Sequence, residues 1–133
     1  MNKQISRKIT HIIKKYYRPK LDCDGQSRMF SWLLQQEGIK HTVNVGAVAW
    51  KGNIFQPHYW IVFPDSDYIL DCKVRKWSNW LNADPQELPN GLFIWKMNPN
   101  APLQYVHITE DSMVMTQELF EILDGISKDD DHD

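Results

Sequence analysis

The chain has 133 residues, of which 42% are hydrophobic and 24% charged, a composition typical of one soluble globular domain. Its net charge of −2 argues against a general nucleic-acid binder, so we expect no nucleic-acid partner. No apolar run approaches the ~20 residues that span a bilayer, and residues 1–17 contain no apolar block with a cleavage site. Two cysteines do not make a disulfide framework. We therefore expect a cytoplasmic protein without membrane contact.

Charge is distributed unevenly along the chain. Residues 1–21 carry seven basic side chains and no acidic one, whereas residues 110–133 carry nine acidic side chains against Lys128 alone. We interpret this asymmetry as a source of solubility and of contact between the two ends of the chain. The last residues are too charged to fold, so we predict a single domain over 1–127 and a disordered acidic tail over 128–133.

Helical periodicity occurs in three main places. Residues 3–17 place isoleucines and Tyr16 on one face of a helix with lysines around it, which we interpret as core packing rather than membrane or nucleic-acid binding. Residues 26–37 are apolar around much of the helix, and Gly38 is a natural terminator, so this helix is expected to be central and buried. Residues 112–123 form the last predicted helix.

From His41 the hydrophobic period changes to two, which indicates β-strands. Alternation in the first strand places four apolar side chains on one face, namely Val43, Val45, Ala47 and Ala49. A second strand, Ile54 to Phe63, and a third, Tyr68 to Cys72, follow after tight turns, so the three form an antiparallel meander. Further strands are predicted over 92–97 and 103–108. The expected fold class is α+β, with the central helix packed on an antiparallel sheet and flanked by N- and C-terminal helices.

Cys23 lies at the start of the central helix. The positive end of the helix dipole favours a thiolate there, and the unpaired N–H groups of the first turn are suited to bind an oxyanion. A cysteine is equally often a small core residue, so its position alone leaves both interpretations open.

His58 and Asp71 fall on neighbouring predicted strands. An aspartate at the end of an apolar strand is costly to bury without a partner, and a histidine on the adjacent strand is a natural one. A thiol nucleophile needs a base, and the base needs a third group that fixes its tautomer. Cys23, His58 and Asp71 therefore form a candidate catalytic trio of nucleophile, base and orienting carboxylate.

Cys72 adjoins Asp71 and is predicted to point to the opposite face, into the core. A zinc site built from Cys23, His58, Cys72 or His41 is the alternative use of these residues. No paired C-x-x-C or H-x-x-x-H spacing supports it, so we predict no metal and no cofactor.

The order of these motifs resembles the transglutaminase-like branch of the papain-like cysteine protease fold, and in particular its small bacterial and phage members. The resemblance covers residues 20 to 80, about half of the chain. Four short motifs carry it, namely Cys23-x-x-x-Ser27, Gly38 at the helix end, His58-Tyr59-Trp60 and Ile69-Leu70-Asp71. Arylamine N-acetyltransferases and lasso-peptide leader peptidases share the same ordered trio. The resemblance implies Cys23 as nucleophile, His58 as base and Asp71 as orienter.

Two positions depart from the family pattern. Asp24 stands where transglutaminases usually have a tryptophan after the nucleophile, and the region before Cys23 lacks the glutamine with which papain-like peptidases hold the oxyanion. Tyr17 and Gln56 are candidates to replace that glutamine, and Trp60 is a candidate for the substrate cleft.

The sequence therefore predicts a cysteine hydrolase or acyltransferase that acts on an amide, with a protein or peptide as substrate. Hydrolysis by a peptidase or deamidase is favoured over transfer to an amine, because water needs no second binding site. The first alternative is a transglutaminase-like fold that has lost catalysis and serves as a protein interaction module. The second is nucleic-acid binding through the basic first helix, which predicts a steep salt dependence.

Overall fold

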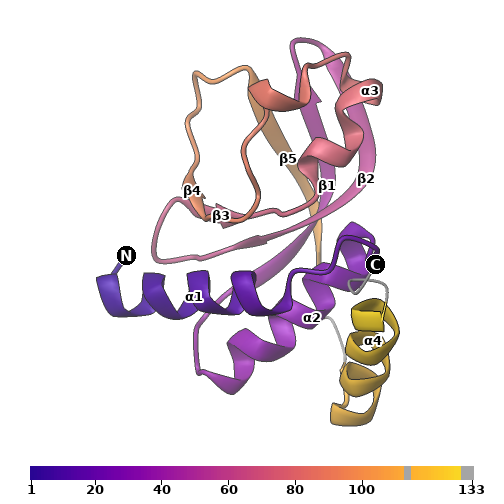
Figure 1. The fold of residues 1–133 in the computed structure, drawn as a ribbon. Helices are drawn as coiled ribbons and strands as arrows, with labels where there is room; N and C mark the ends of the chain where they lie inside the picture. Colours follow the sequence, from indigo (N-terminus) through magenta and orange to yellow (C-terminus); the bar gives the residue numbers. More distant parts are fainter. Residues whose placement is uncertain (113–114, 130–133) are drawn as a thin grey trace.

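A computed structural model of the chain describes residues 1–112 and 115–129. Within them the fold is α+β, with four α-helices and a five-stranded antiparallel sheet (Figure 1). The helices are α1 (Lys3–Tyr16), α2 (Cys23–Gln36), α3 (Ser78–Leu81) and α4 (Gln117–Asp129). The strands are β1 (Thr42–Trp50), β2 (Asn53–Val62), β3 (Tyr68–Leu70), β4 (Trp95–Lys96) and β5 (Leu103–Asp111). Two short 3-10 helices, η1 (Val74–Trp77) and η2 (Pro85–Glu87), complete the set.

The sheet has the strand order β4-β3-β2-β1-β5, and every neighbouring pair is antiparallel. The predicted meander of the first three strands is confirmed, since β1 pairs with β2 and β2 with β3. The predicted strand over 103–108 is also present, and it returns to pair with β1 along its whole length. In the view of Figure 1, α1 and α2 lie below the sheet and α3 lies at the opposite end of β1 and β2.

Gly46 interrupts the regular alternation of β1. Its pairing with β2 shifts register between Gly46 and Val48, and its pairing with β5 shifts between Val45 and Gly46. The predicted single apolar face is therefore wrong for the second half of the strand, where Val48 and Trp50 are buried and Ala49 is half-buried. A Cβ at Gly46 would collide with the Val106 carbonyl oxygen, so only glycine allows β5 to lie this close.

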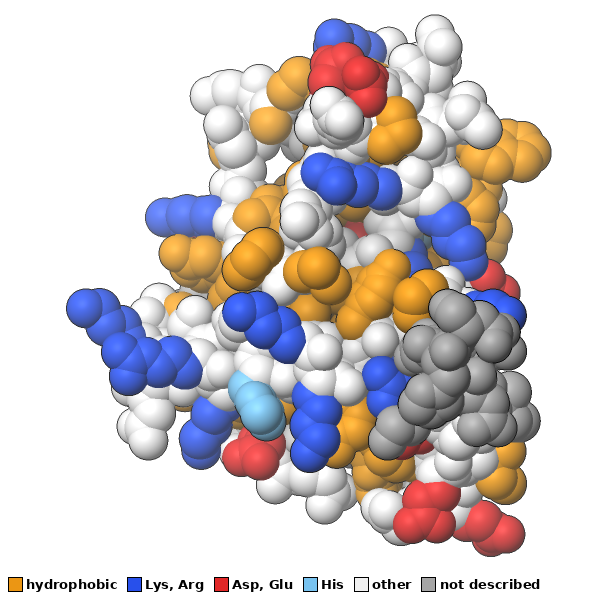
Figure 2. Space-filling view, viewed as in Figure 1, with side chains coloured by type: hydrophobic (Ala, Val, Ile, Leu, Met, Phe, Trp, Pro, Cys, Tyr) orange, Lys and Arg blue, Asp and Glu red, His pale blue; other side chains and the backbone are white. Residues whose placement is uncertain are grey.

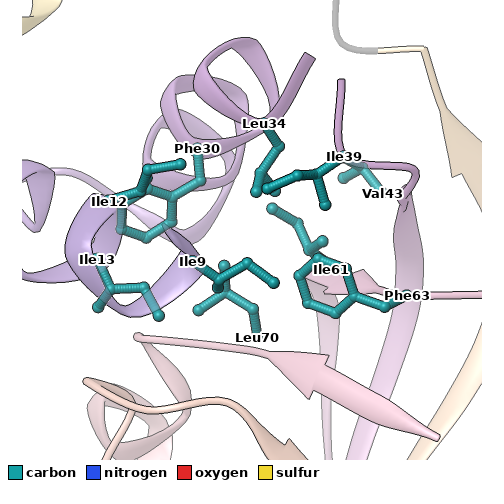
Figure 3. Close-up of a cluster of buried hydrophobic side chains, with 10 residues drawn as sticks. All are labelled: Ile9, Ile12, Ile13, Phe30, Leu34, Ile39, Val43, Ile61, Phe63 and Leu70. Atoms are coloured by element: carbon teal, nitrogen blue, oxygen red, sulfur yellow. The ribbon is translucent and has the colours of Figure 1, made fainter. Parts of the chain in front are cut away.

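Two separate clusters of buried hydrophobic side chains stabilise the fold. The first joins α1 and α2 to the sheet (Figure 3), and its buried members are Ile9, Ile12, Ile13, Phe30, Leu34, Ile39, Val43, Ile61, Phe63 and Leu70. The second lies between β1, β5 and the segment around η1 and α3, and its members are Val48, Trp50, Val74, Leu81, Leu88 and Leu103. The predicted packing of the central helix on the sheet is confirmed by the first cluster.

The predicted helices are present with shifted ends. The first spans Lys3–Tyr16, and the Asn2 side chain caps its N-terminus by accepting from the N–H groups of Gln4 and Ile5. The central helix begins at Cys23 itself rather than at Gln26, which places the cysteine in the first turn.

The last helix begins later than predicted, because β5 continues to Asp111. The helix is Gln117–Asp129 rather than 112–123, so its backbone includes the first two residues of the predicted acidic tail. The rest of that tail, 130–133, lies outside the described residues.

An ion pair attaches α4 to the junction of α1 and α2. The Arg18 guanidinium donates to Asp124 Oδ1 through Nε at 3.1 Å and Nη2 at 2.7 Å, and the two side chains are 8% and 22% exposed. Beside it, the rings of Phe120 and Tyr16 meet edge to face at 5.8 Å. The predicted contact between the basic and acidic ends of the chain is therefore present as a partly buried interaction.

We expect Asp124→Asn to destabilise the protein by about 1 to 2 kcal/mol, because it leaves the buried Arg18 without its carboxylate. Urea unfolding measures the change. The matched control is Glu37→Gln, which removes the exposed pair between Lys8 and Glu37 at 3.6 Å and is expected to cost less than about 0.5 kcal/mol. Equal effects of the two substitutions would contradict a special role for the Arg18–Asp124 pair.

Candidate functional site

The fold brings the predicted trio to one place. Cys23 is the first residue of α2, His58 lies in β2, and Asp71 directly follows β3. The register of β2 and β3 pairs Ile61 with Leu70, so continuing it by one residue brings Asp71 opposite Trp60, on the same face of the sheet as His58. The antiparallel pairing predicted from the turn between these strands thus explains how the histidine and the aspartate meet.

His58 and Asp71 form a buried pair. The distance from His58 Nε2 to Asp71 Oδ2 is 2.6 Å, and the side chains are 0% and 1% exposed. Because the carboxylate accepts, the proton of this hydrogen bond is assigned to Nε2.

Asp71 has two further donors. The Tyr105 hydroxyl donates to Oδ2 at 2.7 Å, and the Lys73 backbone N–H donates to Oδ1 at 3.0 Å. Three donors therefore satisfy a carboxylate that would otherwise be costly to bury. Burial, and then the charge and hydrogen bond of Asp71, raise the pKa of Tyr105 well above its ordinary value, so the phenol stays protonated and remains a donor.

Tyr105 was not among the predicted site residues. It lies in β5, and β2 and β1 lie between β5 and β3 in the sheet, so its strand is not a neighbour of the strand that precedes Asp71. The apolar alternation of 103–108 indicated a strand, but no signal in the sequence fixed the partner of that strand.

The imidazole of His58 is also linked to Cys23. Burial alone would lower the pKa of His58, but the charge and hydrogen bond of Asp71, followed by a hydrogen bond and charge from Cys23, raise it to about 9. Cys23 itself is 7% exposed and is a free cysteine. The structure thus brings all three predicted residues together.

Trp77 occupies the other nitrogen of His58. Its indole Nε1–H donates to Nδ1 at 3.0 Å, and its ring stacks on Phe55 with centroids 3.8 Å apart. Nδ1 accepts a hydrogen bond only while it carries no proton, so this contact requires a neutral imidazole. Trp77 therefore opposes the effect of Asp71 and Cys23, both of which favour the imidazolium. Nδ1 either accepts the hydrogen bond from Trp77 or carries the second proton of the imidazolium, and it cannot do both at once.

The three candidate substrate residues fall in different settings. Trp60 is 2% exposed and packs against Tyr105 at 4.9 Å, so it supports the site from inside and offers no surface to a substrate. Gln56 is exposed on β2. Tyr17 is half-buried beside a cleft that Cys72 also lines.

Cys72 is a protonated thiol rather than a second nucleophile. Its Sγ–H donates to the Gly91 carbonyl oxygen at 2.8 Å, and burial, followed by the charge of Asp71, raises its pKa far above the ordinary value. The Nε2 of His41 lies 2.8 Å from Ser31 Oγ, and its Nδ1 lies 2.9 Å from the Ile39 carbonyl oxygen. Among the described residues, no group of three or more His, Cys, Asp or Glu side chains is arranged to hold a metal ion.

Comparisons of the chain with models of known protein families, with characterised proteins and with solved structures give no match. The described helices include none that is both long enough and apolar enough to cross a bilayer.

We expect Trp77→Phe to raise the pKa of His58 above its value in the wild type. The substitution keeps an aromatic ring against Phe55 but removes the indole N–H that donates to the lone pair on Nδ1. An NMR titration of the His58 ring protons measures the pKa. Phe55→Leu is the control, because it disturbs the same stack and leaves the indole N–H in place. An unchanged pKa in Trp77→Phe would contradict the opposition between Trp77 and Asp71.

The raised pKa of His58 also predicts a pH dependence of stability. The value of about 9 in the folded chain exceeds the ordinary 6.5, so protonation of His58 stabilises the folded state. This contribution is complete below pH ~6.5 and is lost as the pH rises through ~9. It amounts to at most about 3 kcal/mol. Urea unfolding between these pH values measures it, and His58→Gln is expected to lack it. If the wild type and His58→Gln lost the same unfolding free energy between pH ~6.5 and ~9, the raised pKa of His58 would be contradicted.

Proposed function

We propose that this protein is a cysteine-dependent acyl-transfer enzyme that hydrolyses an amide bond. The observation that carries the proposal is the fully buried His58–Asp71 pair, whose imidazole interacts with a cysteine at the N-terminus of α2. A nucleophile, a base and a group that orients the base are the three parts that acyl transfer through a thioester requires.

Catalysis in this proposal starts when the Trp77 N–H leaves Nδ1 of His58. The Cys23 thiol proton then transfers to Nδ1, and the thiolate sulfur attacks the carbonyl carbon of the amide. The tetrahedral intermediate collapses with cleavage of the C–N bond, and His58 returns its Nδ1 proton to the departing amine. Water attacks the thioester while His58 accepts one of its protons. Collapse of this second intermediate breaks the C–S bond and releases the carboxylic acid, and the proton on His58 passes to the departing sulfur, which restores the thiol.

Backbone groups at the start of α2 are suited to hold the oxyanion. The Gly25 N–H donates to Asp24 Oδ1 at 2.8 Å, and the Gln26 N–H donates to the Asp22 carbonyl at 2.9 Å. The N–H groups of Cys23 and Asp24 precede the first complete turn and therefore have no acceptor within the helix. They lie at the positive end of the helix dipole, where negative charge is stabilised.

The order of the three residues supports a papain-like core of the transglutaminase-like type. The cysteine starts a buried helix, the histidine lies in a strand that the helix contacts, and the aspartate follows the next antiparallel strand. Hydrolysis is favoured over crosslinking, because Asp24 replaces the tryptophan that usually follows the nucleophile in transglutaminases.

One observation favours a second candidate, a fold of this type that acts as a protein interaction module without catalysis. Cys23 is 7% exposed, and the Trp77 N–H holds Nδ1 of His58, the nitrogen that must receive the thiol proton. In a module this arrangement is permanent, whereas in an enzyme it is one of two states.

Alkylation of Cys23 by iodoacetamide distinguishes the two candidates. For the enzyme we expect Cys23 to react rapidly with iodoacetamide at neutral pH, and His58→Ala to slow this reaction at least about tenfold. Mass spectrometry separates Cys23 from Cys72, which is expected to stay unreactive.

The matched control is His41→Ala, which removes a half-buried histidine near the other end of α2 and is expected to leave the rate unchanged. A Cys23 that is inert in the folded protein, or that reacts equally in both histidine variants, would contradict the enzyme and favour the module.

A further inference from the structure

A cleft of about 960 Å³ lies beside the site, and its charged lining is entirely basic within the described residues. Its cations come from the end of α1, the α1–α2 connection and the segment that follows β3, and they are Lys14, Lys20, Lys73, Arg75 and Lys76. Figure 2 shows Lys and Arg side chains along α1 and above it, on both sides of a strip of hydrophobic side chains. Cations held this close together repel one another, so a bound anion would stabilise them.

Lys73 connects the cleft to the trio. Its backbone N–H donates to Asp71, and its side chain lines the cleft. The residue as a whole is 4% exposed. Nζ donates to the Arg18 carbonyl at 2.7 Å and lies 4.5 Å from the centre of the Tyr17 ring. Burial, followed by the charge of Lys76, lowers the pKa of Lys73 to about 8. The lining of the cleft therefore comes within two residues of the orienting aspartate along the chain.

Of Lys14, Lys73, Arg75 and Lys76, only Lys76 forms an ion pair with an acidic side chain of the described residues. Asp22 pairs with Lys76 at 3.0 Å, but both side chains are exposed at 72% and 39%, so the pair is readily exchanged for a ligand. Arg75 donates to the Leu88 carbonyl at 3.0 Å, which fixes its position and leaves its charge in place.

The remaining lining is better suited to a peptide than to a nucleic acid. Tyr17, Pro19 and Leu92 supply apolar surface for aliphatic side chains. The Tyr17 ring, which is the aromatic group in the cleft, already has the Lys73 ammonium over its face and offers no free platform for a base. Gly91 and Cys72, which both line the cleft, pack closely enough that a Cβ at Gly91 would collide with the Cys72 backbone.

We propose that this basic cleft binds an acidic peptide segment and so selects glutamate- or aspartate-rich proteins as substrates of the adjacent trio. That the bound peptide is a substrate rests on the proposed function. Binding of the peptide to the cleft does not require catalysis. Carboxylates of the segment pair with the lysines, and its apolar side chains contact Tyr17 and Leu92.

Fluorescence anisotropy with a short labelled peptide of alternating glutamate and leucine tests the proposal, using the full chain carrying Cys23→Ser so that no turnover occurs. We expect binding that is lost when glutamine replaces glutamate in the peptide. The added pair Lys14→Gln/Lys20→Gln is expected to weaken binding about fivefold or more. The control pair Lys3→Gln/Lys40→Gln removes the same charge from exposed lysines outside the cleft and is expected to change binding less than about twofold.

Three results would overturn the proposal. They are no binding of the acidic peptide, equal weakening by the two lysine pairs, and tighter binding of an oligothymidylate of equal charge through the same lysines. Iodoacetamide reactivity of Cys23 is measured separately in the wild type. Peptide binding with an unreactive Cys23 would leave the cleft assigned and reject the enzyme, whereas a reactive Cys23 without peptide binding would reject the cleft alone.

Discussion

The charge of Asp71 is the constraint on which the rest of this structure depends. A carboxylate at 3% exposure is unstable in a protein interior unless donors replace the water that it has lost. His58, Tyr105 and the Lys73 backbone supply those donors from three separate segments, so β2, β5 and the chain after β3 must be correctly placed at once. The aspartate therefore links the positions of these segments to one another, as well as orienting the imidazole.

The sequence was sufficient to predict most of the fold, because periodicity is a local property. The helix over 3–17 and the antiparallel meander were found from spacing alone, and the pairing of His58 with Asp71 followed from the turn between their strands. The bulge at Gly46 was missed because it depends on how closely β5 approaches, which no local pattern records.

The same distinction explains the site. The trio was predictable because each member is chemically conspicuous and lies in a recognisable element. Tyr105 and Trp77 were not assigned to it, because their roles depend on which strand pairs with β1 and on the placement of a short 3-10 helix. Trp60 was predicted as a candidate for the substrate cleft, but it is buried, and the rings of Tyr105 and His58 lie against it.

The contact of Tyr105 with Asp71 also bears on how the protein folds. The two residues are separated by 34 positions, and β5 joins the sheet only after a long excursion through η1, α3 and β4. Contacts of large sequence separation form late and slow the folding of small domains. A partly folded chain without β5 would bury a carboxylate with a missing donor, so such an intermediate is destabilised. The site therefore favours an all-or-none transition, and Asp71 has all three of its donors only when β5 has paired with β1.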